Sequence, residues 1–277
     1  IELMHFGKWV FALTVIIFFC TQGDGIVIGR ILGTTALGFY ALASAISNLP
    51  ATEVTQLVSQ IIFPMYAKFQ SDIQKLQKVY FNTIGLIIFI TIPLTFGIIF
   101  LGEDFVFLFL GEKWLPMVPS MKLLAFAGFI RSLVATGGCL FSAVGEPEKD
   151  FQMNICRFLT MLITIYPLTK LYGIMGASLS VVLSIASTIP NWLIESKRIT
   201  KAKISYFLPV FAPPLFSSIA MVILVIWIKS ILCGTSPLKF VSTIILATSF
   251  YLFLIYLFWK RFKLGPIGEI KILKSSL

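Results

Sequence analysis

The sequence predicts an all-α protein that crosses a membrane about eight times. Of its 277 residues, 58% are hydrophobic and only 12% are charged, about half the roughly 25% charged residues usual in soluble domains. The mean hydropathy is +0.96, and a soluble protein of that composition could not keep its surface dispersed in water. The composition therefore excludes disordered, fibrous, nucleic-acid-binding and disulfide-rich secreted proteins, and leaves a polytopic membrane protein.

Eight apolar stretches are long enough to span a bilayer, which takes about 20 mostly apolar residues in a helix. In chain order they cover residues 9–31, 37–63, 79–101, 121–144, 152–171, 173–194, 206–228 and 238–259. The fifth and sixth are separated only by the turn Tyr172-Gly173-Ile174. Two connections look helical themselves. Residues 66–78 predict an amphipathic helix on the cytoplasmic membrane surface, and residues 102–120 predict a short interfacial helix on the other side.

The basic residues predict how these helices are oriented. The chain carries 22 Lys and Arg against 12 Asp and Glu. With eight crossings, both ends share one side, and that side holds most of the basic residues. The opposite side holds only Arg30, Lys113, Lys122, Lys170, Lys229 and Lys239. Because cytoplasmic loops are enriched in Lys and Arg, we expect both ends of this multi-pass chain in the cytoplasm, at the inner membrane.

Cysteine and histidine give no sign of a metal site or of histidine-based catalysis. The four cysteines lie far apart, at Cys20, Cys139, Cys156 and Cys233, and the single histidine is His5. Glu103 and Asp104 could form an external acidic pair, but such pairs are more often solvated loop residues. The chain begins with Ile1 rather than Met and shows no signal peptide, so we expect it to be the C-terminal part of a longer protein.

Asp24 is an ionisable residue at membrane depth, after a run of apolar residues in the first helix. Such residues usually face a cavity or a partner. We interpret Asp24 as a carboxylate that couples transport to a proton or sodium gradient. The alternative is an interfacial Asp paired with Arg30. The neighbouring Gly23 and Gly25 indicate close packing or a local helix break.

The second helix carries a polar stripe on its later half, formed by Asn48, Thr52, Glu53, Gln56, Ser59 and Gln60. Glu53, Gln56 and Gln60 share one helix face. A lipid-facing helix would not tolerate this face, so we expect it to line a wet substrate path, with Glu53 as a second candidate for ion coupling. Hydrogen bonding that only holds the helices together remains the alternative.

Two arginines lie within or near the crossings. Arg131 is about ten residues into the fourth helix, where it could grip phosphate or carboxylate, or form an internal salt bridge to Asp24 or Glu53. Arg157 and Asn154 share a face at the start of the fifth helix. We interpret Arg157 mainly as a cytoplasmic anchor, with binding at the cavity entrance as the alternative.

Several segments in order resemble the polysaccharide flippases of the multidrug/oligosaccharidyl-lipid/polysaccharide superfamily. They are DGIVIGRILGTTALGFYALASAISNLP at 24–50, Phe63-Pro64, KFQSD at 68–72, LGEKW at 110–114, SAVGEP at 142–147 and YGIMGA at 172–177. The resemblance implies the C-terminal lobe of a MATE-like fold at residues 1–197, followed by two additional transmembrane helices and a basic tail at 198–277. It also implies an N-terminal lobe outside this chain.

The resemblance further implies a function. The family exports polyprenyl-pyrophosphate-linked oligosaccharide units for O-antigen, capsule or exopolysaccharide, by ion-coupled alternating access in the lipid bilayer and alongside polysaccharide polymerase machinery. The chain would then be no enzyme and would hold no cofactor or metal. Arg131 and Arg30 would bind the pyrophosphate, and Asn48, Thr52, Gln56 and Gln60 would bind the sugars. The rival readings are a drug or cationic-metabolite exporter of the same fold, a membrane glycosyltransferase using Glu103 and Asp104, and a purely structural membrane partner.

Overall fold

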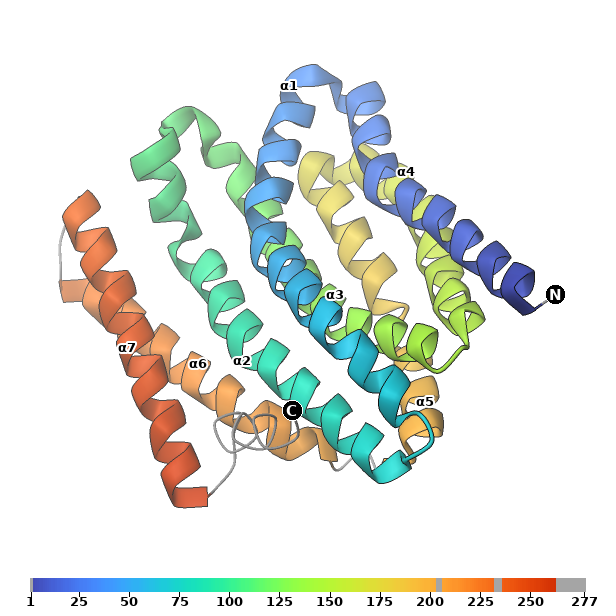
Figure 1. Cartoon of the computed structure of the whole chain (residues 1–277). Coiled ribbons are helices and arrows are strands. Elements are labelled where there is room, and N and C mark those ends of the chain that lie inside the picture. The colour runs from blue at the N-terminus through green and yellow to red at the C-terminus, as the bar shows by residue number, and fades with distance from the viewer. Residues whose placement is uncertain (1, 203–205, 232–235, 263–277) are drawn as a thin grey trace.

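The described residues of the computed structural model, 2–202, 206–231 and 236–262, form a bundle of long helices without a β-strand (Figure 1). The elements are α1 (Glu2–Phe69), α2 (Ile73–Phe105), a π-helical turn (Val106–Leu110), a 3-10 turn (Glu112–Met117), α3 (Val118–Ala143), α4 (Pro147–Ala186), α5 (Ile189–Thr200), α6 (Phe207–Ile231) and α7 (Pro237–Phe262).

Two glycines fold the longest helices back on themselves. Gly33 in α1 has φ 84° and ψ 178°, and Gly173 in α4 has φ 60°, conformations that a side chain would strain. Figure 1 shows α1 rising from the N-terminus and reversing, so that residues 2–32 and 34–69 are separate crossings. Six helical stretches are long and apolar enough to span a membrane, and two of them contain these glycines. The expected count of about eight crossings is therefore confirmed.

Of the two readings of Gly23 and Gly25, the local helix break is wrong, since the backbone is helical through both and the break lies at Gly33. The other reading, close packing, agrees with the structure, because a Cβ at Gly25 would meet Leu37 at 3.7 Å.

The prediction of a separate surface helix over residues 66–78 is wrong, because α1 continues to Phe69 and α2 begins at Ile73. Asp72 caps α2 by accepting a hydrogen bond from the backbone N–H of Lys75 at 3.2 Å, so α1 and α2 are joined by a tight turn. The Lys75 ammonium lowers the pKa of the Asp72 carboxyl through a further side-chain hydrogen bond.

The apolar residues of that segment belong to the core, because Tyr66 and Leu76 are buried against α3 and α5. On the other side, residues 102–120 form no independent helix. The π and 3-10 turns there continue α2 directly and lead into α3, with a reversal at Gly111 (φ 92°).

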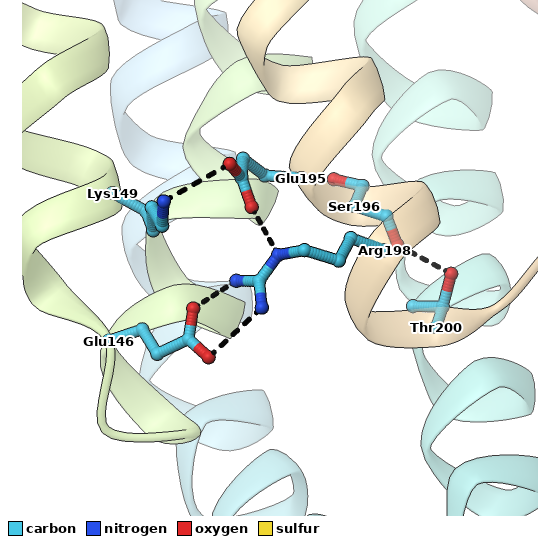
Figure 2. A network of polar contacts seen from close by, with 6 residues as sticks. All are labelled: Glu146, Lys149, Glu195, Ser196, Arg198 and Thr200. Carbon is cyan, nitrogen blue, oxygen red and sulfur yellow. Dashed lines mark hydrogen bonds and ion pairs between the residues drawn. The ribbon is translucent and has the colours of Figure 1, made fainter.

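α4 and α5 are fastened to each other by a polar network (Figure 2). Arg198 of α5 pairs with Glu146, which precedes α4, and with Glu195 at 2.6 Å, while Lys149 reaches Glu195 at 3.4 Å. Beneath it, Trp192 is buried next to Gly137 of α3.

α6 and α7 form a pair that packs against α2, on the side of the bundle away from the N-terminus (Figure 1). Leu101 of α2 meets Met221 and Val225 of α6 and Tyr251 of α7 in a small apolar core. The Tyr251 hydroxyl donates to the backbone carbonyl of Phe89 at 2.8 Å, and Lys229 pairs with Asp104 at 2.7 Å.

Candidate functional site

A cavity of about 680 Å³ lies between α1, α3 and α4. Most of its wall is apolar, which suits a pocket that orients a ligand by a few polar groups. Those polar and charged groups are Ser59 and Gln60 from α1, Arg131 and Ser142 from α3, Asp150, Asn154 and Arg157 from α4, and Thr188 just after α4.

Arg131 enters this cavity from the middle of α3. Its Nη1 donates to the Asn48 side-chain oxygen at 3.1 Å, while its Nε is buried without a hydrogen-bond partner. The internal salt bridge considered for Arg131 is not formed, because within the described residues no carboxylate lies within 4 Å of its guanidinium. Arg131 thus has hydrogen-bonding capacity left for a ligand.

Arg157 reaches the same cavity from α4, and its interpretation as a surface anchor is wrong. The side chain is only 8% exposed. Its Nη2 donates to the backbone carbonyl of Cys20 at 3.5 Å, and its Nε is buried without a partner. α4 begins at Pro147 rather than near residue 152, which places Arg157 about 15 Å from the start of the helix.

Asp24 is held by a tyrosine from the other half of α1. The Tyr40 hydroxyl donates to one carboxylate oxygen at 2.5 Å, and the Gly25 backbone N–H donates to the other at 2.8 Å. Arg30 is exposed and does not pair with it. Asp24 is not among the residues that line the cavity, and it forms no ion pair with Arg131 or Arg157.

The polar stripe of α1 divides between two environments. Ser59 and Gln60 line the cavity, and Asn48 stands behind Arg131. Thr52, Glu53 and Gln56 instead lie on the exposed surface of this chain. The structure thus brings Arg131, Asn48 and Gln60 together and leaves Arg30, Thr52 and Gln56 outside the cavity.

Three further acidic residues lie in or near the membrane-spanning helices, Asp150 in the cavity and Glu103 and Asp104 outside it. Asp150, which sequence reasoning did not single out, lines the cavity beside Asn154. The signal was weak, since Asp150 lies in the charged stretch EPEKD and reads as a loop residue. Glu103 and Asp104 form separate ion pairs, with Lys122 at 3.5 Å and Lys229 at 2.7 Å. Among the described residues, no cluster of three acidic, histidine or cysteine side chains could hold a metal.

A second cavity of about 610 Å³ lies between α1, α2, α6 and α7, and its wall is almost entirely aliphatic and aromatic. With six helical stretches long and apolar enough to cross a membrane, the chain has the architecture of a multi-pass membrane protein. Its fold is similar to that of a solved lipid II flippase, MurJ, in an inward closed conformation. The two share a TM-score of 0.73 at 16% identity, over 87% of this chain and 52% of that one.

The sequence comparisons identify the relatives. Residues 1–119 match a family model described as polysaccharide biosynthesis protein. The lipopolysaccharide biosynthesis protein WzxC of Escherichia coli is 27% identical over 71% of this chain and 40% of its own length. The teichuronic acid biosynthesis protein TuaB of Bacillus subtilis is 31% identical over 46% of this chain and 26% of its own length.

These matches confirm the expected resemblance to the polysaccharide flippases of the multidrug/oligosaccharidyl-lipid/polysaccharide superfamily. The chain spans about half the length, or less, of the relatives that it matches.

Proposed function

We propose that this chain is part of a flippase that moves polyprenyl-pyrophosphate-linked oligosaccharide units from the cytoplasmic to the outer leaflet, for O-antigen, capsule or exopolysaccharide synthesis. The names of its relatives support this substrate class, and the MurJ-like fold supports alternating access. The lipid would remain in the bilayer while the polar head passes through the cavity. No bond is made or broken in this process, so the protein acts as a transporter rather than an enzyme.

The observation that carries the proposal is the pair of arginines in one cavity, with Arg157 buried and Arg131 half-buried. A guanidinium at membrane depth costs several kcal/mol unless something pairs with it. Arg131 and Arg157 each keep an unpartnered buried Nε, and neither forms an ion pair within the part of the chain described. Planar guanidinium groups match phosphate oxygens in pairs, so a diphosphate would supply the charge that these side chains lack.

The two rival activities fit the structure less well. A cavity with two arginines would repel the organic cations that a drug exporter of this fold would carry. A glycosyltransferase would need Glu103 and Asp104 free for metal or sugar-nucleotide binding, yet both carboxylates are paired with lysines.

We further propose that the Asp24–Tyr40 pair couples export to a proton or sodium gradient, because it is a carboxylate within reach of the electric field of both arginines. Glu53, exposed on α1, is the weaker candidate. Residues 1–197 would form the transport lobe and 198–277 the additional helices and basic tail. The exposed polar face of α1 at Thr52, Glu53 and Gln56 would then meet an N-terminal lobe.

The excess of basic residues on one side favours an inner-membrane protein with both ends of this chain in the cytoplasm. There it would stand beside the polymerase machinery that consumes the exported units.

The test is export by variants that remove one cavity arginine at a time. In cells that depend on this protein, Arg131→Ala and Arg157→Ala should each lower surface polysaccharide at least tenfold, because a charge-assisted bond is worth about 1.5–3 kcal/mol. Lipid-linked oligosaccharide should accumulate on the cytoplasmic leaflet. Lys113→Ala is the matched control, since it removes one exposed positive charge far from the cavity. Normal export by both arginine variants would refute the assignment of the cavity.

A further inference from the structure

Asp150 is a carboxylate on the cavity wall that has no cation to neutralise it. It lies four residues before Asn154 on α4, and the Asn154 amide donates to both its side-chain Oδ1 at 3.0 Å and its backbone oxygen at 2.9 Å. Over the described ranges, no Lys, Arg or His nitrogen comes within 4 Å of it. Both side chains line the cavity that also holds Arg131 and Arg157.

The Asp150 carboxylate lies close to the backbone of α3 at Gly138. A Cβ at Gly138 would stand 2.8 Å from the Asp150 Oδ2, which is closer than real Cβ contacts come. The carboxylate is thus packed directly against the backbone of α3, and any other residue at position 138 would push it away. The carboxylate therefore lies between α3 and α4, in the space that the missing side chain of Gly138 leaves open.

The place of Asp150 in the first turn of α4 does not explain why its side chain lines the cavity. An acidic residue in the first turn of a helix is favoured by the helix dipole, and this favours Asp150 wherever its side chain points. Glu148 shares that first turn without lining the cavity. A carboxylate that faces a membrane cavity without a counter-ion is costly and marks a ligand or proton pathway.

Along both helices, the residues at this carboxylate lie seven positions away from the arginines. Asp150 precedes Arg157 by seven residues on α4, and Gly138 follows Arg131 by seven residues on α3. Seven residues of α-helix rise about 10 Å. The cavity therefore has two levels, a cationic level at Arg131 and Arg157 and an acceptor level at Asp150 and Asn154. A diphosphate and the sugar attached to it can bridge that separation.

From this arrangement we infer that Asp150 and Asn154 form a subsite for the hydroxyl groups of the first, diphosphate-linked sugar, and that this sugar is uncharged. The inference rests on the proposed function and adds to it a specificity site. An ionised carboxylate accepts hydrogen bonds from hydroxyls and donates none. The Asn154 amide already donates to Asp150, so its side-chain oxygen adds a further acceptor for sugar hydroxyls. The same carboxylate repels a uronic acid placed at this level.

Binding of short diphosphate diesters to the purified protein in nanodiscs tests the subsite. The reference ligand is geranyl methyl diphosphate, and the test ligands replace the methyl group with glucose, galactose, N-acetylglucosamine or glucuronic acid, so that the diphosphate charge stays constant. At least one neutral sugar should improve the dissociation constant about tenfold over the methyl diester. Glucuronic acid should give no improvement.

The variants separate this site from the arginine site. Asp150→Ala should abolish the gain from the neutral sugar without weakening the affinity for the methyl diester, because it removes a negative charge from a cavity that binds an anion. Gly138→Ala should also abolish the gain, by displacing the carboxylate. Asp150→Asn should admit the glucuronosyl ligand. Glu148→Ala, in the same helical turn but outside the cavity wall, is the control and should behave as the wild type.

The inference is overturned if no neutral sugar improves binding, or if the improvement survives in Asp150→Ala. Failure of Arg131→Ala and Arg157→Ala to weaken the methyl diester would instead count against the proposed function. Absence of binding by every diphosphate would overturn both.

Discussion

At the residue scale, Asp24 differs from the two cavity arginines in how far its hydrogen-bonding groups are occupied. Asp24 accepts from Tyr40 and from the Gly25 backbone, so both of its oxygens have donors. Arg131 and Arg157 instead hold weak or single contacts, at 3.1 Å to Asn48 and 3.5 Å to Cys20. In the proposed function, this difference would give them different roles: Asp24 would respond to an ion, whereas the arginines would respond to an anionic ligand.

The Asp24–Tyr40 pair gives a prediction about coupling. In proteoliposomes that carry the protein, Asp24→Asn should make export independent of an imposed proton or sodium gradient, because the group that changes charge is gone. Tyr40→Phe should weaken the dependence and lower stability by about 1–3 kcal/mol, since it removes a donor from a half-buried carboxylate. Tyr166→Phe, at an exposed tyrosine, is the control. Gradient dependence that survives Asp24→Asn would remove Asp24 from the coupling role.

The sequence identified Arg131 and Asp24 for a physical reason, since each is a lone ionisable group inside a long apolar run. It misplaced Arg157 because the fifth crossing was expected to begin near residue 152, whereas α4 begins at Pro147. Five residues are about 7.5 Å of helix, enough to turn an apparent surface anchor into a buried group. Asp150 was missed for the same reason, since its neighbours Glu146, Glu148 and Lys149 are charged loop or first-turn residues.

At the element scale, single glycines decide where helices end. Most crossings could be located from apolar length alone, and the turn at Gly173 was expected from its sequence. The segment 66–78 was misjudged because helical periodicity marks an apolar face without showing what that face packs against. Here it packs on the bundle through Tyr66 and Leu76 rather than on lipid.

Gly33 offers a prediction at this scale. Gly33→Ala should destabilise the protein by about 1–3 kcal/mol, because φ 84° with ψ 178° is a conformation essentially restricted to glycine. Gly38→Ala is a matched control in the following helical turn, where a Cβ meets nothing within 4 Å. It should leave stability unchanged or raise it by up to about 1 kcal/mol. Thermal unfolding in detergent measures both, and equal effects would show that Gly33 is not a required hinge.

The attachment of α5 gives a second prediction. Gly137→Ala should cost about 1–3 kcal/mol, because the new methyl group would overlap the buried Trp192 ring. Arg198→Ala, which removes the ion pairs to Glu146 and Glu195 drawn in Figure 2, should cost about 1 kcal/mol or less, since the Arg198 side chain is 47% exposed. Unfolding by denaturant distinguishes them. A larger loss for Arg198→Ala would mean that the ion pairs, rather than the packing, hold α5.

At the scale of the whole molecule, the two cavities lie on different parts of the bundle. The arginine cavity belongs to α1, α3 and α4, whereas the apolar one lies where α6 and α7 meet α2. The number of crossings and the membrane class followed from composition and helix length. The grouping of polar residues did not, because it depends on which helices become neighbours, and a single sequence does not encode that in any local pattern.

The orientation of the bundle leads to a labelling prediction. Lys113 and Gln74 are exposed residues near opposite ends of α2. With the natural cysteines changed to serine, Lys113→Cys should react in intact cells with a thiol reagent that does not cross membranes. Gln74→Cys should react only after the cells are permeabilised. The reverse pattern would place the ends of this chain outside the cytoplasm.

The two cavity arginines also bear on how the chain enters the membrane during synthesis. On insertion scales, an arginine at the centre of a helix opposes partition into lipid by about 2.5–3.5 kcal/mol. Arg131 and Arg157 lie on α3 and α4, which are joined by the three residues Val144, Gly145 and Glu146. Neither helix can shield its arginine alone, since the cavity wall needs α1 as well. We therefore expect the translocon to release this hairpin late, as a unit and against helices already inserted, so that the same charges that serve transport also set the order of assembly.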